Sequence, residues 1–320
     1  MANQITLMQF LQQDPPGFQF QHRSYSNTST KNRKYENAAI TSIGRWGSFN
    51  IFTILQQYDH LINIDVSIAS DALVSTPPPL LGAEDGLREL VATYVDRPVR
   101  RALARTFEHL AANNAPFMRG RTPVTLGAGS SARTVDEFMP DRAFYDPTAA
   151  VALDPQNPRA TVPPPPPNRL PGEIKPSHKW SADWLGDPSA ELLVFSRLGQ
   201  LSYYMVLQGI GHPQHRGAKY GYMINDKGLV AFRKVNAHGS IEHSDPIPWG
   251  GAGDTPQRLT VMLALWYLGM LASSDSDWTL PTVLGDPGDE QLRASPAATA
   301  PPQSRPTAVA QGPATVSSRR

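Results

Sequence analysis

Glu173 and Lys175, in the stretch GEIKPSHKW, are an acid and a base two residues apart. If this stretch is a β-strand, side chains at positions i and i+2 share one face, so both project together while Ile174 enters the core. The carboxylate can then hold a hard divalent cation through oxygen. The ammonium can orient a water molecule or stabilise charge that develops on a phosphate. The spacing therefore predicts metal-assisted chemistry on a phosphate, provided that a second acid lies nearby.

The second acid of such a site is expected just before the proline run VPPPPPNRLP. Mg²⁺ is usually held by one or two carboxylates together with water and phosphate oxygens. Asp141, which follows Pro140, is the candidate if its strand pairs with the strand of Glu173, since the proline run is then a surface loop between two paired strands. Asp146 and Asp154 are nearby acids and remain alternatives.

Supporting polar groups are expected on a helix from Glu191 to Gly209, ELLVFSRLGQLSYYMVLQG. Gln200 and Tyr204 are four residues apart, so they share one face of this helix. A polar pair aimed at the end of the sheet can steady Lys175 or contact a nucleic-acid backbone.

Three further charged residues each have a functional and a structural interpretation. Arg233, near the end of a β-rich run, could contact phosphate or belong to an ordinary charge pair at a sheet edge. Glu89 and Glu108, on early helices, could add a third acid to the site, but we favour a surface position for both.

The elements that must position these residues follow from periodicity and from turn signals. A mostly helical segment, GLRELVATYVDRPVRRALARTFEHLAANN, should be interrupted at Pro98 and end at Asn113-Asn114. Two β-rich runs, KYGYMI and LVAFRKV, flank a hairpin signature at residues 225–228, and an apolar helix from Leu259 to Ala272 follows. This order predicts an α/β (α+β) fold with a mixed sheet.

Composition divides the chain into three parts. Residues 1–36 are polar, so we expect a flexible N-terminal segment, and residues 286–320 are rich in Pro, Ala and Ser, which predicts a disordered tail. One domain is expected over residues 37–285, with a Pro-rich insertion at 155–171.

Charge and cysteine content limit the function classes. The net charge is +1, from 29 basic and 28 acidic residues, so bulk charge does not argue for nucleic-acid binding. The chain has no Cys, which excludes disulfides and thiolate metal sites. The N-terminus lacks a secretory signal pattern, and the helix at 259–272 is too short to span a bilayer. We expect an intracellular protein, nuclear or cytoplasmic, that has no membrane partner.

The order of motifs resembles the PD-(D/E)XK nuclease-like superfamily. The sequence of PD, E-x-K and Q-x-x-x-Y on a following helix is typical of its RecB-like branch. The pattern is more similar still to a fungal group of nuclease-like proteins, and the resemblance covers residues 138–272. The stretches that carry it are PGEIKPSHKW, GQLSYYM, YGYMINDKGLVAFRKV, PIPW and LTVMLALWYLGMLA.

The resemblance implies a restriction-endonuclease-like mixed β-sheet flanked by helices and a Mg²⁺ site at Asp141 and Glu173, which could also take Mn²⁺. Lys175 would be the catalytic lysine, supported by Gln200 and Tyr204. In such enzymes the metal polarises the phosphate and lowers the pKa of a bound water. The implied function is hydrolysis of phosphodiester bonds, with DNA as the expected substrate. The alternative is a catalytically inactive module that acts in nucleic-acid or protein interaction.

Overall fold

The computed structural model describes residues 5–13, 15, 20–21, 40–66, 83–133, 138–148, 165–207, 215–236, 239–250 and 257–281. These residues belong to one compact unit, Met1–Leu284. The predicted C-terminal tail at 286–320 lies outside the described residues.

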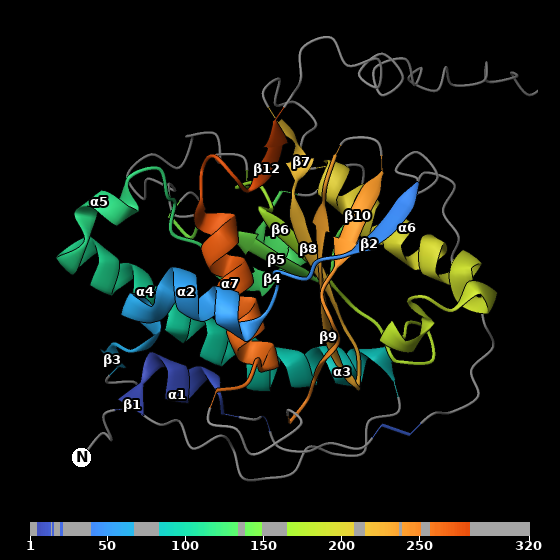
Figure 1. The fold of residues 1–320 in the computed structure, drawn as a ribbon, viewed down its shortest axis with the longest axis horizontal. Helices are drawn as coiled ribbons and strands as arrows, with labels where there is room; N and C mark the ends of the chain where they lie inside the picture. The colour runs from blue at the N-terminus through green and yellow to red at the C-terminus, as the bar shows by residue number, and fades with distance from the viewer. Residues whose placement is uncertain are drawn as a thin grey trace, which may run out of the picture. The chain divides into compact units, whose positions relative to one another are not determined.

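An eight-stranded mixed sheet forms the centre of this unit (Figure 1). The β6–β8 and β10–β2 pairs are parallel, and the other pairs are antiparallel. The predicted mixed α/β fold is therefore confirmed. In sheet order the strands are β2 (Ser42–Arg45), β10 (Ser240–His243), β9 (Gly228–Lys234), β8 (Tyr220–Ile224), β6 (Leu170–Ile174), β5 (Arg142–Tyr145) and β4 (Thr125–Ala128), and β11 (Ile247–Pro248) also pairs with β9.

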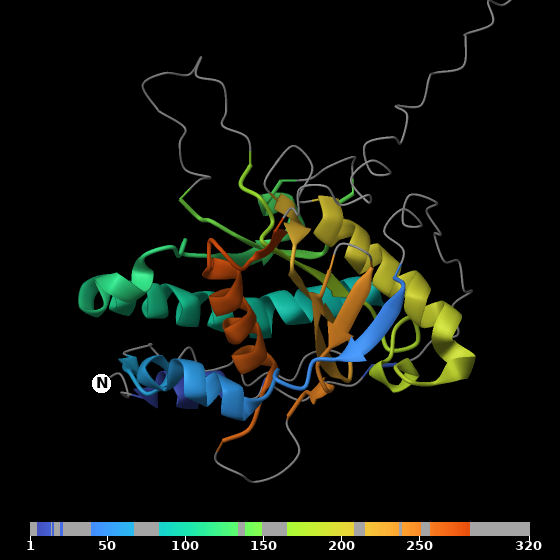
Figure 2. The same cartoon turned by 45° about the horizontal axis from the view of Figure 1, so that its top comes forward.

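Helices cover both faces of the sheet, because alternate strand residues bury apolar side chains on opposite sides (Figures 1 and 2). Ile174 and Tyr222 pack into the larger core, whereas Met223 and Phe232 pack into a separate core with the long helix α6. The larger core is built with α1 (Leu7–Leu11), α2 (Ile51–Ile62), α3 (Glu84–Val91), α4 (Arg97–Asn113) and α7 (Val261–Ser273), and the separate core with α6 (Glu191–Leu207).

Short elements complete the described structure. They are the helix α5 (Ala115–Met118), three 3₁₀ turns (Gly129–Ser131, Ala182–Trp184 and Pro188–Ala190), and two small strand pairs, β1 (Ile5–Thr6) with β3 (Asp65–Val66) and β7 (His215–Ala218) with β12 (Thr279–Pro281).

Helix α7 confirms the predicted apolar helix at 259–272. It begins after Thr260, whose hydroxyl accepts a hydrogen bond from the Leu263 backbone N–H, and it is buried along nearly its whole length. No helix among the described residues is long and apolar enough to cross a membrane.

The predicted hairpin is also confirmed. β8 and β9 pair antiparallel, and Asn225 closes the turn between them. Its side-chain oxygen accepts hydrogen bonds from the backbone N–H groups of Lys227, at 2.8 Å, and Gly228, at 2.9 Å.

The interruption at Pro98 takes a different form from the expected break. A π-helical segment, Ala92–Asp96, joins α3 to α4, and the backbone stays helical through the junction (Figure 2). Proline lacks an N–H donor, and a π-helical turn is one way to absorb the missing hydrogen bond without ending the helix. The predicted end at Asn113 is confirmed.

Part of the N-terminal segment that we expected to be flexible is structured. Helix α1 begins with a reciprocal cap between Thr6 and Gln9, and Leu7 and Leu11 are fully buried in the larger core. The apolar residues of α1 are few and stand among polar ones, so the composition of residues 1–36 does not reveal this short helix.

The Pro-rich insertion ends earlier than predicted. β6 already begins at Leu170, and Pro166 and Asn168 are buried before it. Pro166 accepts a hydrogen bond from the Arg133 backbone N–H at 2.7 Å, so the last prolines belong to the folded domain. Residues 155–164 of the insertion lie outside the described residues.

Candidate active site

Glu173 and Lys175 lie at the end of β6, near the middle of the sheet. Ile174 is fully buried in the larger core, and Glu173 faces α6 on the opposite side of the sheet, since its register partner Met223 packs there. The Lys175 Nζ atom lies 2.7 Å from Glu173 Oε2. The predicted arrangement, with the acid and the base together and the isoleucine inward, is present.

Asp141 completes the predicted pair of acids because β5 pairs antiparallel with β6. This pairing places Arg142 opposite Gly172 and brings Asp141, the residue just before β5, beside the end of β6. Asp141 Oδ2 accepts a hydrogen bond from the Ile174 backbone N–H at 2.8 Å. Two strands far apart in the sequence therefore fix the two carboxylates.

The alternatives to Asp141 are not placed at this site. Asp146 follows the opposite end of β5, where its carboxylate accepts hydrogen bonds from the backbone and hydroxyl of Thr148. Asp154 lies outside the described residues.

A third acid, Glu84, was missed by sequence reasoning. It begins α3, and its carboxylate lies 3.3 Å from Lys175 Nζ and 2.8 Å from Lys179 Nζ. The acids considered from the sequence, Glu89 and Glu108, are both exposed, as we favoured. The local sequence signal for Glu84 is its spacing of four residues from Arg88, which predicts an ion pair on one helix face. Such pairs are common on helix surfaces, so this spacing does not indicate a functional site.

The ammonium group of Lys175 is surrounded by oxygen atoms on several sides. Its Nζ atom lies 2.7 Å from Glu173 Oε2, 3.3 Å from Glu84 Oε1, 3.4 Å from the Ile174 carbonyl oxygen and 3.6 Å from Asp141 Oδ2. We call these four groups the oxygen cage. Helix α3, the end of β6 and the residue before β5 each supply part of it.

Two further cations hold the outer carboxylate oxygens of the cage. Arg88 Nε lies 2.8 Å from Asp141 Oδ1, and Lys179 Nζ lies 2.8 Å from Glu84 Oε2. Arg88 also contacts Glu84 and the exposed carboxylate of Asp85. The acids of the site are therefore neutralised by side chains of the chain itself.

Burial and charge act against each other on the groups of the cage. Burial raises the pKa of Glu173 to about 7; the Lys175 ammonium opposes this rise, and the Asp141 carboxylate adds to it. Burial acts to lower the pKa of Lys175, but the surrounding carboxylates outweigh it and raise this pKa. Burial likewise acts to raise the pKa of Glu84, but the ammonium groups of Lys175 and Lys179 outweigh it and lower this pKa.

Gln200 connects α6 to the carboxylate of Glu173. Its Nε2 atom lies 3.4 Å from Glu173 Oε2 and 3.0 Å from the hydroxyl oxygen of Tyr204. The predicted pair on one helix face is present, but Gln200 contacts the acid of the site rather than Lys175.

Arg233 is not brought to this site. Its register partner Tyr220 packs in the larger core, so Arg233 lies on the sheet face opposite to Glu173. There its Nε atom lies 2.6 Å from Glu242 Oε2, and its guanidinium lies 4.9 Å from the ring centre of Trp46. This placement favours the structural interpretation over contact with phosphate.

The donor type of the cage fits a hard divalent cation, because carboxylate and carbonyl oxygens are the ligands that Mg²⁺ prefers. In the described residues, no three His, Cys, Asp or Glu side chains are grouped so that they could hold a metal ion by themselves. Two carboxylates completed by water and phosphate oxygens are enough for Mg²⁺, so Asp141 and Glu173 remain the candidate ligands.

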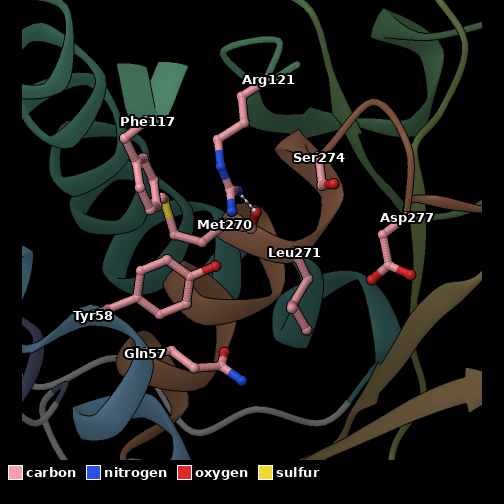
Figure 3. A pocket seen from close by; sticks show the side chains of 8 residues that line it. All are labelled: Gln57, Tyr58, Phe117, Arg121, Met270, Leu271, Ser274 and Asp277. Carbon is pink, nitrogen blue, oxygen red and sulfur yellow. Dashed lines mark hydrogen bonds between the residues drawn. The ribbon is translucent and has the colours of Figure 1, made fainter. Parts of the chain in front are cut away.

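A separate cavity of about 350 Å³ lies over the helices of the larger core and contains no residue of the oxygen cage (Figure 3). Arg121 points into it, donates a hydrogen bond to the Met270 carbonyl oxygen at 2.9 Å and stacks on Phe117. These contacts hold the end of α7, so Arg121 has a structural role there.

No protein-family model matches the sequence, and no curated protein matches it.

Proposed function

We propose that the chain is a metal-dependent nuclease-like protein that hydrolyses phosphodiester bonds in DNA. The observation that carries the proposal is the convergence of Glu84, Asp141 and Glu173 on Lys175 at the end of a central strand. The resemblance of the motif order to the PD-(D/E)XK nuclease-like superfamily and its fungal group supports the same function. The expected site of action is intracellular, in the nucleus or the cytoplasm.

Four residues of the site, Asp141, Glu173, Lys175 and Gln200, have roles in the proposed reaction. Asp141 and Glu173 would hold Mg²⁺ or Mn²⁺, which would polarise the phosphate and lower the pKa of a bound water. Lys175, whose ammonium lies beside these acids, would position the attacking water or stabilise the negative charge that develops on the phosphate. Gln200 fixes the orientation of the Glu173 carboxylate, since its amide donates to Oε2.

The alternative function is a nuclease-like module that binds nucleic acid or protein without cutting. The observation that favours it is the set of ion pairs in which Lys175, Lys179 and Arg88 already satisfy the acids of the cage. A site of this kind is complete without a metal ion, so a fold of nuclease type can keep it after activity is lost.

The experiment that separates the two functions is cleavage of plasmid and single-stranded DNA by purified protein with Mg²⁺, Mn²⁺ or EDTA. Lys175→Ala and Glu173→Ala are compared with Lys227→Ala and Glu108→Ala, two exposed controls that form surface ion pairs. If the protein cuts DNA only with a metal ion, and only Lys175→Ala and Glu173→Ala abolish the cutting, the protein is a nuclease. If the folded wild-type protein cuts DNA with neither metal, the alternative function as a binding module is the one that remains.

A further inference from the structure

The charges of the candidate site balance before any metal ion is added. Three carboxylates, from Glu84, Asp141 and Glu173, contact three cations of the chain, Lys175, Lys179 and Arg88. The carboxylate of Asp85, which also contacts Arg88, is 90% exposed, so solvent screens it. With all three acids ionised, the buried part of the site is neutral.

The ammonium of Lys175 also occupies the position that a cation would need. The oxygens of Glu173 and Asp141 that would coordinate the metal are the ones that face Lys175 Nζ, at 2.7 Å and 3.6 Å. A divalent cation that binds these oxygens displaces the ammonium from them and adds two positive charges to a neutral, buried site. Uncompensated charge in such a place is costly, so the cation needs a negative partner.

Lys179 and Arg88 can leave the carboxylates that they contact and bind the negatively charged group that accompanies the metal. The side chains of Lys179 and Arg88 are 41% and 36% exposed, whereas that of Lys175 is 10% exposed. Lys179 and Arg88 can therefore turn toward a phosphate at the surface, while Lys175 stays in the interior. A phosphodiester carries one negative charge, which offsets half of the added charge, and it supplies oxygen ligands to the metal.

We propose that the site takes up its divalent cation together with a phosphodiester of the substrate, and that Lys175 competes with the metal for the oxygens of Glu173 and Asp141 when the substrate is absent. This inference rests on the proposed function, because it concerns the loading of the same site.

The first test measures the coupling between metal and nucleic acid. Binding of a fluorescently labelled oligonucleotide is followed by anisotropy in Mn²⁺ and in EDTA, at one pH and one ionic strength. Because coupling is reciprocal, Mn²⁺ should tighten binding of the oligonucleotide by about tenfold or more. The double variant Asp141→Asn/Glu173→Gln should show no tightening, and a gel of the same samples reports any cleavage.

The second test measures metal binding without nucleic acid. The electron paramagnetic resonance signal of free Mn²⁺ gives the affinity of wild type, Lys175→Gln and the exposed control Lys227→Gln. Removal of the competing ammonium should tighten Mn²⁺ binding by about tenfold. Lys227→Gln should match wild type, since its partner Asp183 is at the surface.

The outcomes separate this inference from the proposed function. If the protein cleaves DNA but binds Mn²⁺ equally well with and without the oligonucleotide, the inference is overturned. The proposed nuclease function then still stands. Coupling without cleavage supports the inference and assigns the site to a binding module. If Lys175→Gln, shown to be folded by circular dichroism, binds Mn²⁺ no better than wild type, the competition is refuted.

Discussion

In the metal-free protein, the stability of Glu173→Gln relative to wild type should increase as the pH rises. Glu173 is 2% exposed, and burial raises its pKa from 4.5 to about 7 despite the opposing charge of Lys175. Between these two values the folded protein binds more protons than the unfolded chain, so the free energy of unfolding falls as the pH increases. The stability that protonated Glu173 contributes is fully present below pH 4.5 and lost above pH 7.

The magnitude follows from the size of the pKa difference. A rise from 4.5 to about 7 corresponds to about 3 kcal/mol in the free energy of unfolding, at ~1.4 kcal/mol per pH unit. Gln has nearly the same shape and does not titrate, so Glu173→Gln should lack this loss. The difference in stability between variant and wild type should therefore grow by about 3 kcal/mol across the window, in favour of the variant.

The assay is urea denaturation at several pH values in EDTA, with Glu108→Gln as a matched control on an exposed acid. The stability difference between the control and wild type should not change with pH. A Glu173→Gln difference that stays flat, or that shifts toward wild type as the pH rises, would show that Glu173 is not a buried acid of raised pKa.

Three further predictions concern the surroundings of this acid. Lys175→Met removes the ammonium 2.7 Å from Glu173 and should lower the free energy of unfolding by about 3 kcal/mol at alkaline pH, with a smaller loss at acidic pH in the same denaturation assay. Gln200→Leu should lower metal affinity by about tenfold or more, measured by Mn²⁺ titration, while the circular dichroism spectrum stays unchanged. Gly172→Ala would place a Cβ atom 2.2 Å from Tyr222 Cζ and should cost about 2 kcal/mol or more in urea denaturation, and an unchanged midpoint would contradict the packing.

The sheet and the inner part of the site could be predicted because their signals are local. The Asn225 turn fixes the hairpin, since its side chain closes the loop within three residues. The positions of Glu173 and Lys175 follow from alternation along one strand. Asp141 required one further assumption, the pairing of β5 with β6, and the structure has this pairing.

The parts that were wrong depend on packing rather than on local pattern. Leu7 and Leu11 are ordered by contacts with helices far along the chain, and a composition average over residues 1–36 does not report such contacts. Pro98 has a clear local effect, the loss of one donor, but packing along α3 and α4 decides whether the helix breaks or widens into a π-helical turn.

Glu84 shows why sequence reasoning recovered the strand part of the site but not its third acid. A carboxylate in the first turn of a helix is favoured by the helix dipole alone, so its presence at that place carries no functional information. What distinguishes Glu84 is that β6 ends beside the start of α3, which brings Lys175 and Lys179 against it. The identity of the third acid is therefore a property of the packing between α3 and β6. A substitution that moves α3 should weaken the site even though it changes no charged residue.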